Sequence, residues 1–337
     1  MAVALVGPTA SGKSDIALAV ARALPGPGGV ELVSIDSMAV YRGLDIGTAK
    51  PSAAVRAEVP YHLLDLVDPD EDFSVTRFQE AAVGVLEGIA ARGGKALLVG
   101  GTGLYLRAIT DGLTFPGRYP AVAAGLVAEL DGLGTDGSLQ RSAGRADLLR
   151  RLRQLDPVAA SRIEPGNERR LVRALEVTIG SGHPFSSFGP GLDRYPHSPI
   201  TLLGIHRDGD EADRRIGERF ARLMDEGLLD EVRALAARPA GLSRTARQAL
   251  GYRELLTHVE DGVPLDEAVD EAVRRTRAFA KRQRAWFRRD PRIEWIDVEA
   301  DPVTTVLEHL EKVGREHGGT GVGAPRSGPV RDCGGSP

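Results

Sequence analysis

The sequence predicts an α/β fold, in which a P-loop-type parallel sheet flanked by helices carries a helical insertion domain. Three observations predict it. GPTASGKS, residues 7–14, has the spacing of a phosphate-binding loop between a strand and a helix. Strand-like and helix-like runs alternate over residues 1–115. Between residues 116 and 199, helix-forming stretches rich in Arg, Leu and Ala replace that alternation.

The first strands and helices follow one another closely. AVALV (2–6) and VELVSID (30–36) have the apolar content of buried strands, and a helix is expected from Ser14 to Leu24 between them. A second helix over 73–93 precedes the strand KALLVGG (95–101). In a parallel sheet of this kind, phosphate groups bind at the carboxyl ends of the strands.

The rest of the chain first leaves the sheet and then returns to it. ADLLRRLRQLD (146–156) and RRLVRALEVTI (169–179) predict helices of the insertion, residues 116–199. The core, residues 1–115 and 200–315, resumes with a strand at TLLGIHRD. Its remaining predicted elements are long helices over 210–238 and 264–289 and a late strand over 292–299.

Composition excludes several classes of protein. With 337 residues, 42% of them hydrophobic, the chain can bury a full core. No window approaches the roughly 18 apolar residues of a membrane helix. The one cysteine, Cys333, forms no disulfide framework, and it lies in a Gly/Pro/Ser-rich segment, 318–337, typical of a disordered tail. A monomer in the reducing cytoplasm is therefore expected.

The P-loop assigns a first group of site residues. Backbone N–H groups and the positive end of the following helix would hold two linked phosphates, with Lys13 as a point charge and Ser14 on Mg²⁺. Such loops are typical of ATP-binding proteins, and Mg²⁺ is the expected cofactor. The phosphate-binding candidates are Gly7, Pro8, Thr9, Ala10, Ser11, Gly12, Lys13 and Ser14. His62, His183 and His206 have no metal-ligand spacing.

One carboxylate is expected in the same crevice. P-loop NTPases usually carry an apolar strand ending in Asp, whereas KALLVGGTGLYL ends in Gly-Gly-Thr. Asp36 instead follows the second strand, where it would meet the group that accepts the transferred moiety. An Asp after a strand is equally typical of a turn or a helix cap, so both roles stay open.

Eight motifs together carry a family resemblance. They are GPTASGKS, DSMAVYRGLDIGTAKP, YHLLD, VGGTGLYLRA, RALEV, DRRIGERF, QALGYREL and RRTRAFAKRQRAWFRR, in this order. The chain from about residue 3 to 315 resembles the bacterial tRNA dimethylallyltransferases, or tRNA isopentenyltransferases. The resemblance implies transfer of the dimethylallyl group of dimethylallyl diphosphate to N6 of the adenine 3′ of certain tRNA anticodons, position 37. Diphosphate would leave as a C–O bond breaks.

The resemblance also implies catalytic roles. Asp36 would accept the N6 proton, Thr102 would contact the target nucleotide, and Arg219 would reach the diphosphate. Arg215 lies one helical turn before Arg219 and remains an alternative. Thr102 is also a possible cap of the helix that follows it.

A basic helix predicts contact with RNA. Nine Lys or Arg residues lie between Arg274 and Arg292, against a single acid, Asp290. A stripe of uncharged side chains at helical spacing would pack inward and leave the bases outward. The stripe consists of Thr276, Phe279, Gln283 and Trp286.

The resemblance extends the RNA surface to further segments, which would hold an anticodon stem-loop while the target base leaves its stack. The implied tRNA-binding residues are Asp36, Ser37, Met38, Ala39, Thr102, Arg169, Arg170, Leu171, Val172, Arg173, Gln248, Ala249, Leu250, Gly251, Tyr252, Arg253, Lys281, Arg282, Gln283, Arg284, Ala285, Trp286, Phe287 and Arg288. Family members often carry an arginine where this chain has Ala123 and Ala124. Arg118 would replace that RNA contact, or the contact is absent.

Two other functions are alternatives to dimethylallyl transfer. One is that of a P-loop kinase of a small molecule, and the other is that of a nucleotide-switched RNA-binding protein.

Overall fold

The computed structural model describes residues 2–131, 137–189, 191–192 and 194–318. Within them, the chain forms two compact units. Of the described residues, 2–72, 82–102 and 199–318 form the core unit, and those within 73–81 and 103–198 form the helical unit. Of the predicted disordered tail, Gly318 ends the last helix, and residues 319–337 lie outside the described residues.

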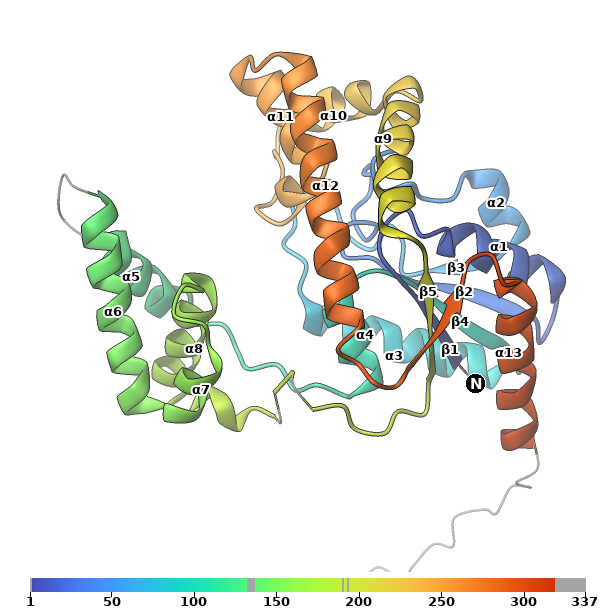
Figure 1. The fold of residues 1–337 in the computed structure, drawn as a ribbon, viewed down its shortest axis with the longest axis horizontal. Helices are drawn as coiled ribbons and strands as arrows, with labels where there is room; N and C mark the ends of the chain where they lie inside the picture. Colours follow the sequence, from blue (N-terminus) through green and yellow to red (C-terminus); the bar gives the residue numbers. More distant parts are fainter. Residues whose placement is uncertain (1, 132–136, 190, 193, 319–337) are drawn as a thin grey trace, which may run out of the picture. The chain divides into compact units, whose positions relative to one another are not determined.

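A single parallel sheet of six strands forms the centre of the core unit, as predicted (Figure 1). Its strands, in spatial order, are β3 (Tyr61–His62), β2 (Val30–Ile35), β4 (Lys95–Gly100), β1 (Ala2–Val6), β5 (Thr201–His206) and β6 (Ile293–Asp297). Val6 and Ile35 both pair with Gly100. The next residue of each strand therefore leaves the sheet at the same level, so that Gly7, Asp36 and Gly101 begin three neighbouring loops.

Helices α1 (Lys13–Ala23) and α13 (Pro302–Gly318) lie side by side along one face of the sheet (Figure 1). Val20 of α1 and Leu310 of α13 are buried in the same cluster as Leu97 of β4. Apolar side chains three and four residues apart on each helix give it one buried face. The first and last described helices thus share one hydrophobic core.

Four more helices pack on one another beyond the carboxyl ends of the strands (Figure 1). They are α9 (Gly209–Asp225), α10 (Leu228–Ala236), α11 (Tyr252–Asp261) and α12 (Leu265–Phe287). The prediction of one continuous helix over 210–238 was wrong. Gly227 has φ +98°, a left-handed conformation that only glycine adopts readily, so the chain turns there and α10 starts anew.

The remaining elements are shorter or belong to the helical unit. α2 (Ala53–Glu58), α3 (Val75–Ala91) and the 3₁₀ turn η2 (Ala246–Gln248) connect parts of the sheet and its helices. The elements after β4 and before β5 are α4 (Gly103–Thr110), α5 (Pro120–Asp131), α6 (Gly137–Leu155), α7 (Pro157–Arg162), α8 (Glu168–Ser181) and η1 (Phe185–Ser187). In the part of the chain that the structure describes, no helix is both long and apolar enough to cross a bilayer.

Removing the side chain of Leu310 is expected to destabilise the core unit. Leu310 is 1% exposed, so Leu310→Ala leaves a cavity between α13 and the sheet and lowers the free energy of unfolding by about 2–5 kcal/mol. Denaturant unfolding measures the loss. Glu308→Ala, at an exposed position of the same helix, is the control and should stay within about 0.5 kcal/mol of the parent. A similarly small loss for Leu310→Ala would show that α13 adds little to the core.

Candidate active site

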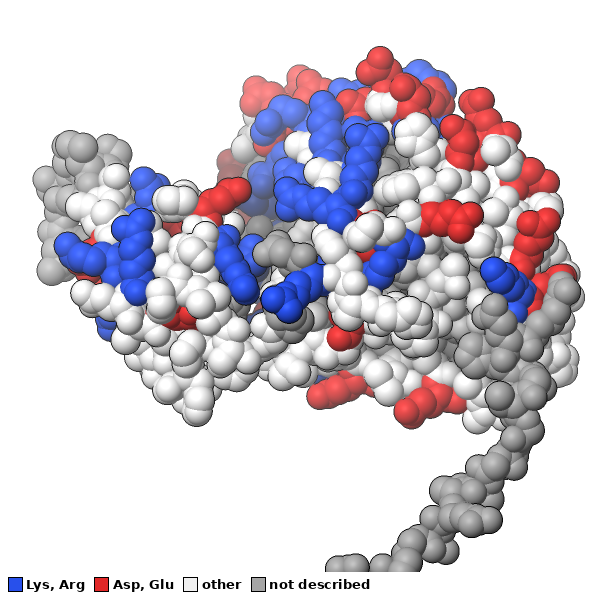
Figure 2. Space-filling view, turned by 60° about the horizontal axis from the view of Figure 1, so that its bottom comes forward, with Lys and Arg blue, Asp and Glu red and all other residues white. Residues whose placement is uncertain are grey.

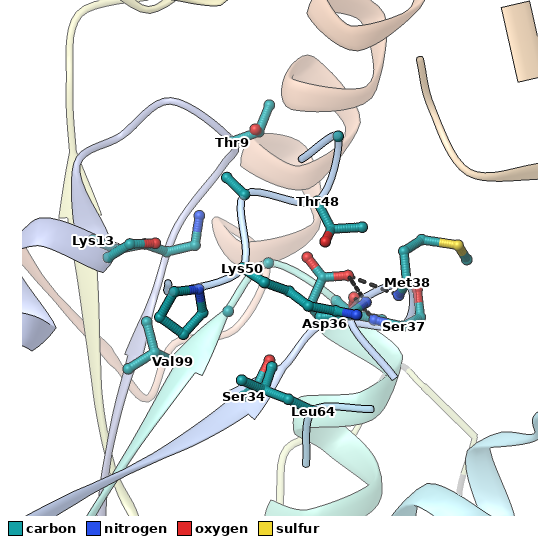
Figure 3. Close-up of a pocket in the computed structure, with 18 of the residues that line it drawn as sticks. Thr9, Lys13, Ser34, Asp36, Ser37, Met38, Thr48, Lys50, Leu64 and Val99 are labelled. Carbon is teal, nitrogen blue, oxygen red and sulfur yellow. Dashed lines mark hydrogen bonds between the residues drawn. The ribbon is translucent and has the colours of Figure 1, made fainter. Parts of the chain in front are cut away.

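A cavity of about 470 Å³ opens at the carboxyl ends of the strands, entirely within the core unit (Figure 3). Its walls come from the P-loop, the ends of β2 and β4, the loop before α2, and helices α9 and α12. The predicted site residues that line it are Thr9, Lys13, Ser14, Asp36, Ser37, Met38, Ala39, Thr102, Arg219, Ala249, Leu250 and Gln283. The cavity therefore brings residues far apart in the sequence to one place.

The P-loop bends around the ammonium group of Lys13. Ala10 and Gly12 have φ values of +63° and +93°, so the loop turns back before α1 begins. Lys13 Nζ donates a hydrogen bond to the carbonyl oxygen of Pro8 at 3.0 Å. Burial, and then repulsion from Arg219, lower the pKa of Lys13 to about 8, although Asp36 acts in the opposite direction. An anion bound here would raise the pKa of Lys13 and so favour its charged form.

Arg219 approaches the same loop from α9. Its Nη1 donates to Thr9 Oγ1 at 3.4 Å, and burial lowers its pKa while the nearby Asp36 raises it. Arg219 and Lys13 also line a second cavity, of about 260 Å³, together with Ala10 and Gly12 of the loop. Arg215 lines only this second cavity. Of the two arginines, Arg219 is thus the one that lies beside both cavities.

Asp36 faces Lys13 across the main cavity (Figure 3). Its Oδ1 accepts hydrogen bonds from the backbone N–H groups of Met38 at 2.8 Å and Ala39 at 3.4 Å. Among the described residues, Oδ2 has no hydrogen-bond partner. One carboxylate oxygen therefore stabilises the turn, and the other is available to a ligand, so the two predicted roles are compatible.

The glycines after β4 let neighbouring chains approach closely. A Cβ on Gly100 would lie 2.1 Å from the carbonyl oxygen of Ile35, and one on Gly101 would lie 2.3 Å from Gln283 Nε2. Thr102 follows; its N–H donates to Ile35, and its Oγ1 accepts from the N–H of Ser37, each at 3.3 Å. Thr102 thereby ties the end of β4 to the segment that carries Asp36.

Gln283 connects helix α12 to two of these loops. Its side-chain Oε1 accepts from the N–H of Thr9, and its Nε2 donates to the carbonyl oxygen of Gly101, both at 2.9 Å. The residue is buried. Thr276 and Phe279 of the same predicted stripe also line the cavity. The inward face of α12 therefore belongs to the site.

The outward face of α12 carries basic side chains, and Figure 2 shows Lys and Arg gathered on one face of the core unit. Lys281, Arg282, Ala285 and Arg288 are exposed, whereas Arg284 and Trp286 are partly buried and Phe287 is buried. Within the described residues, these bases form one ion pair, in which Asp213 Oδ2 lies 3.8 Å from Lys281 Nζ. This surface is open to an anionic partner.

The QALGYR segment divides between surface and interior. Gln248 and Arg253 are exposed and joined by a hydrogen bond of 3.1 Å. Ala249, Gly251 and Tyr252 are buried. The phenol of Tyr252 donates to Glu231, so its side chain is bonded within the protein.

The predicted RNA segment of the helical unit lies at the start of α8. Arg169 and Arg170 are exposed, Val172 is partly buried, and Leu171 is buried in that unit's hydrophobic core. Arg173 pairs with Glu176 at 2.7 Å and donates to the carbonyl oxygens of Pro116 and Gly117. Arg118 is exposed, as is Ala124, while Ala123 is partly buried.

Two residues near the cavity, Lys50 and Glu231, were not predicted from the sequence as site residues. Lys50 lines the cavity, and its Nζ donates to Tyr41 O, Asp45 Oδ1 and Asp65 Oδ1 at 2.5–2.8 Å. Glu231 on α10 accepts hydrogen bonds from the loop that leads to Lys50. DIGTAKP, which contains Lys50, was noted as a motif, but no residue pattern marks Glu231 on an amphipathic helix.

The oxygen ligands beside the P-loop suit Mg²⁺. Ser14 and Asp15, in the first turn of α1, are exposed and line the cavity. Mg²⁺ is usually held by one or two protein oxygens together with substrate phosphates and waters, so a hydroxyl and a carboxylate fit it. Across the described residues, no group of three or more His, Cys, Asp or Glu side chains is arranged to hold a metal ion.

Comparison with known proteins supports the resemblance seen in the motifs. The IPP transferase family model matches residues 39–290. The tRNA dimethylallyltransferase of Salinispora arenicola is 47% identical over 295 residues, 88% of this chain and 82% of the relative. That of Desulforudis audaxviator is 42% identical over 316 residues, 93% of this chain and 98% of the relative. The crystal structure of the Bacillus halodurans tRNA isopentenylpyrophosphate transferase matches with a TM-score of 0.64 at 34% identity, covering 94% of this chain and 99% of that one. The chain belongs to the IPP transferase family.

Proposed function

We propose that this protein transfers the dimethylallyl group of dimethylallyl diphosphate to N6 of adenine 37 in certain tRNAs and releases diphosphate. The observation that carries the proposal is a single cavity in which two cations, Lys13 and Arg219, lie across from the carboxylate of Asp36. Such an arrangement suits an anionic leaving group on one side and a proton-releasing nucleophile on the other. The curated relatives bear the matching name.

The P-loop side would stabilise the leaving group. As the bond between C1 of the dimethylallyl group and its oxygen breaks, the electron pair goes to diphosphate, whose charge is met by Lys13, Arg219 and the N-terminal end of α1. Mg²⁺, held by the Ser14 hydroxyl and the Asp15 carboxylate, would add charge neutralisation on the phosphates when bound.

The Asp36 side would activate the acceptor. The exocyclic amine of adenine is a weak nucleophile because its lone pair is delocalised into the ring. As N6 forms its bond to C1, it must lose a proton, which the available Oδ2 of Asp36 would accept. Thr102 would hold the Asp36 segment in place through its hydrogen bond to Ser37.

The outward face of α12 would bind the RNA backbone, because exposed bases with few acidic neighbours attract phosphates. We also propose that Arg169 and Arg170, and with them the helical insertion 116–199, contact tRNA. We further propose that the protein acts as a monomer, in the cytoplasm where its tRNA substrate is found.

A direct assay tests the function. The protein is incubated with Mg²⁺, labelled dimethylallyl diphosphate and tRNA that lacks the modification, and the label is mapped in the RNA. Label on adenine 37 supports the proposal, and a tRNA with guanine at that position is the control. Turnover of ATP without label in RNA would instead indicate a kinase.

Lys13→Ala is expected to weaken binding of dimethylallyl diphosphate by about 1.5–3 kcal/mol, the typical contribution of a charged hydrogen bond, and to leave tRNA affinity unchanged. Because the pKa of Lys13 is about 8, donor affinity should be full below that pH and fall as the pH rises through it. Lys13→Arg, always charged, should lack this fall. Calorimetric titration of the donor measures both effects, and an equal loss of tRNA affinity in Lys13→Ala would contradict the assignment.

Replacing Lys281, Arg284 and Arg288 together with alanine should weaken tRNA binding and flatten its salt dependence. Each lost phosphate contact removes about 0.7–0.9 from the slope of log affinity against log salt. Filter binding at several salt concentrations gives the slope. A control variant with Arg22, Arg42 and Arg233 replaced loses the same charge from acid-paired surface positions and should keep the parental slope.

Asp36→Asn should bind both substrates but transfer the dimethylallyl group about 100-fold more slowly or worse, the typical contribution of a positioned general base. The asparagine oxygen can still accept the N–H groups of Met38 and Ala39, so the turn should persist. Single-turnover transfer at saturating donor and tRNA measures the rate. A near-normal rate in the folded variant would leave Asp36 only its role in the turn.

A further inference from the structure

We propose that Glu231 is a positioning residue of the donor site: its carboxylate fixes the loop Asp45–Lys50, which forms one wall of the cavity. The inference rests on the proposed function and assigns a role in it to a residue that does not itself line the cavity. Glu231 would act through the backbone of the loop and would touch neither substrate.

The carboxylate of Glu231 accepts hydrogen bonds from three consecutive backbone N–H groups. Asp45 donates at 3.1 Å, Ile46 at 2.9 Å and Gly47 at 3.4 Å. Successive amides that point to one anion form a concave anion-binding arrangement, here filled by a side chain of the same protein. One charge on α10 therefore sets the conformation of this stretch of the loop.

Tyr252 completes the contact from α11. Its hydroxyl donates to Glu231 Oε1 at 2.5 Å, and burial together with that carboxylate raises its pKa, so the phenol stays a donor. Its ring lies against Gly47, where an added Cβ would come within 2.4 Å of a ring carbon. Glu231 and Tyr252 thus hold the loop by hydrogen bonds and by packing.

The loop held in this way reaches the reacting groups. Gly47, Thr48, Ala49 and Lys50 all line the main cavity, and Figure 3 shows Thr48 and Lys50 beside Asp36. Ala49 lines the second cavity as well and has φ +51°, a conformation that the surrounding contacts must maintain. If the loop were not held in this conformation, binding of the donor would have to order it. The entropy cost of that ordering would lower the affinity for the donor.

The test compares Glu231→Gln with Asp230→Asn. Asp230 precedes Glu231 on α10, is 81% exposed and pairs only with Arg233 among the described residues, so its variant loses a charge without touching the loop. Calorimetry measures binding of dimethylallyl diphosphate without tRNA, filter binding measures tRNA affinity, and steady-state assays give KM and kcat.

Glu231→Gln should raise the Kd and KM for dimethylallyl diphosphate about tenfold or more, within the roughly 100-fold that a misplaced site can lose. Its tRNA affinity should stay within about twofold, as should every value for Asp230→Asn, since independent surface changes are small. Tyr252→Phe, which keeps the ring on Gly47, should shift donor affinity in the same direction by less. The double variant should be no weaker than Glu231→Gln alone, because the phenol acts through the carboxylate.

Unchanged donor affinity in folded Glu231→Gln would overturn the proposal, and so would an equal loss of tRNA affinity, which would indicate general loosening of the fold. If Glu231→Gln fails to fold, the donor affinity of Tyr252→Phe decides, and an unchanged value there would overturn the proposal. Absence of label in tRNA with the parent protein would refute the proposed function instead, because the donor-binding measurements require no transfer.

Discussion

The site depends on the alignment of three parallel strands that end at the same level. Val6 and Ile35 pair with one residue of the middle strand, Gly100, so the loops that carry the phosphate-binding residues, the carboxylate and the Gly-Gly-Thr turn start side by side. A register shift of a single residue would move Asp36 by about 3.3 Å along its strand and separate it from Lys13. Backbone pairing, rather than any side-chain contact, thus sets the basic geometry.

Electrostatics then divides the cavity into two ends. Burial lowers the pKa of both Lys13 and Arg219, and repulsion from Arg219 lowers the pKa of Lys13 further. Asp36 partly offsets this repulsion from the other wall. A site with this arrangement of charges favours a multiply charged anion over a neutral ligand, because its two cations are only partly offset by Asp36. Helix α12 contributes both to the cavity and to the basic surface. Its buried Gln283 binds the backbone of Thr9 and Gly101, while the bases on its outer face are exposed to solvent.

Much of this could be predicted from the sequence because the signals are local. Each of three patterns can be recognised in a short stretch of sequence: the P-loop motif, the apolar strands of five or six residues and the run of bases. The alternation of strands with helices then predicts the parallel sheet. The break at Gly227 was missed because an amphipathic pattern continues on both sides of it. The roles of Glu231 and Gln283 could not be predicted, because the loop residues that Glu231 binds lie 184–186 residues away in the chain and the two partners of Gln283 lie 182 and 274 residues away.

The order of the strands also constrains how the protein is made. β1 leaves the ribosome before the other five strands of the sheet, yet one of its neighbours, β5, begins only at Thr201, and α13, which covers the same face as α1, starts at Pro302. The nascent chain therefore cannot bury β1 on both edges and faces until α13 has been synthesised. Contacts of such long range form slowly, because distant segments must find each other before burial rewards them. The P-loop is thus translated before the other segments that line the cavity, and it acquires its final surroundings only after they have followed.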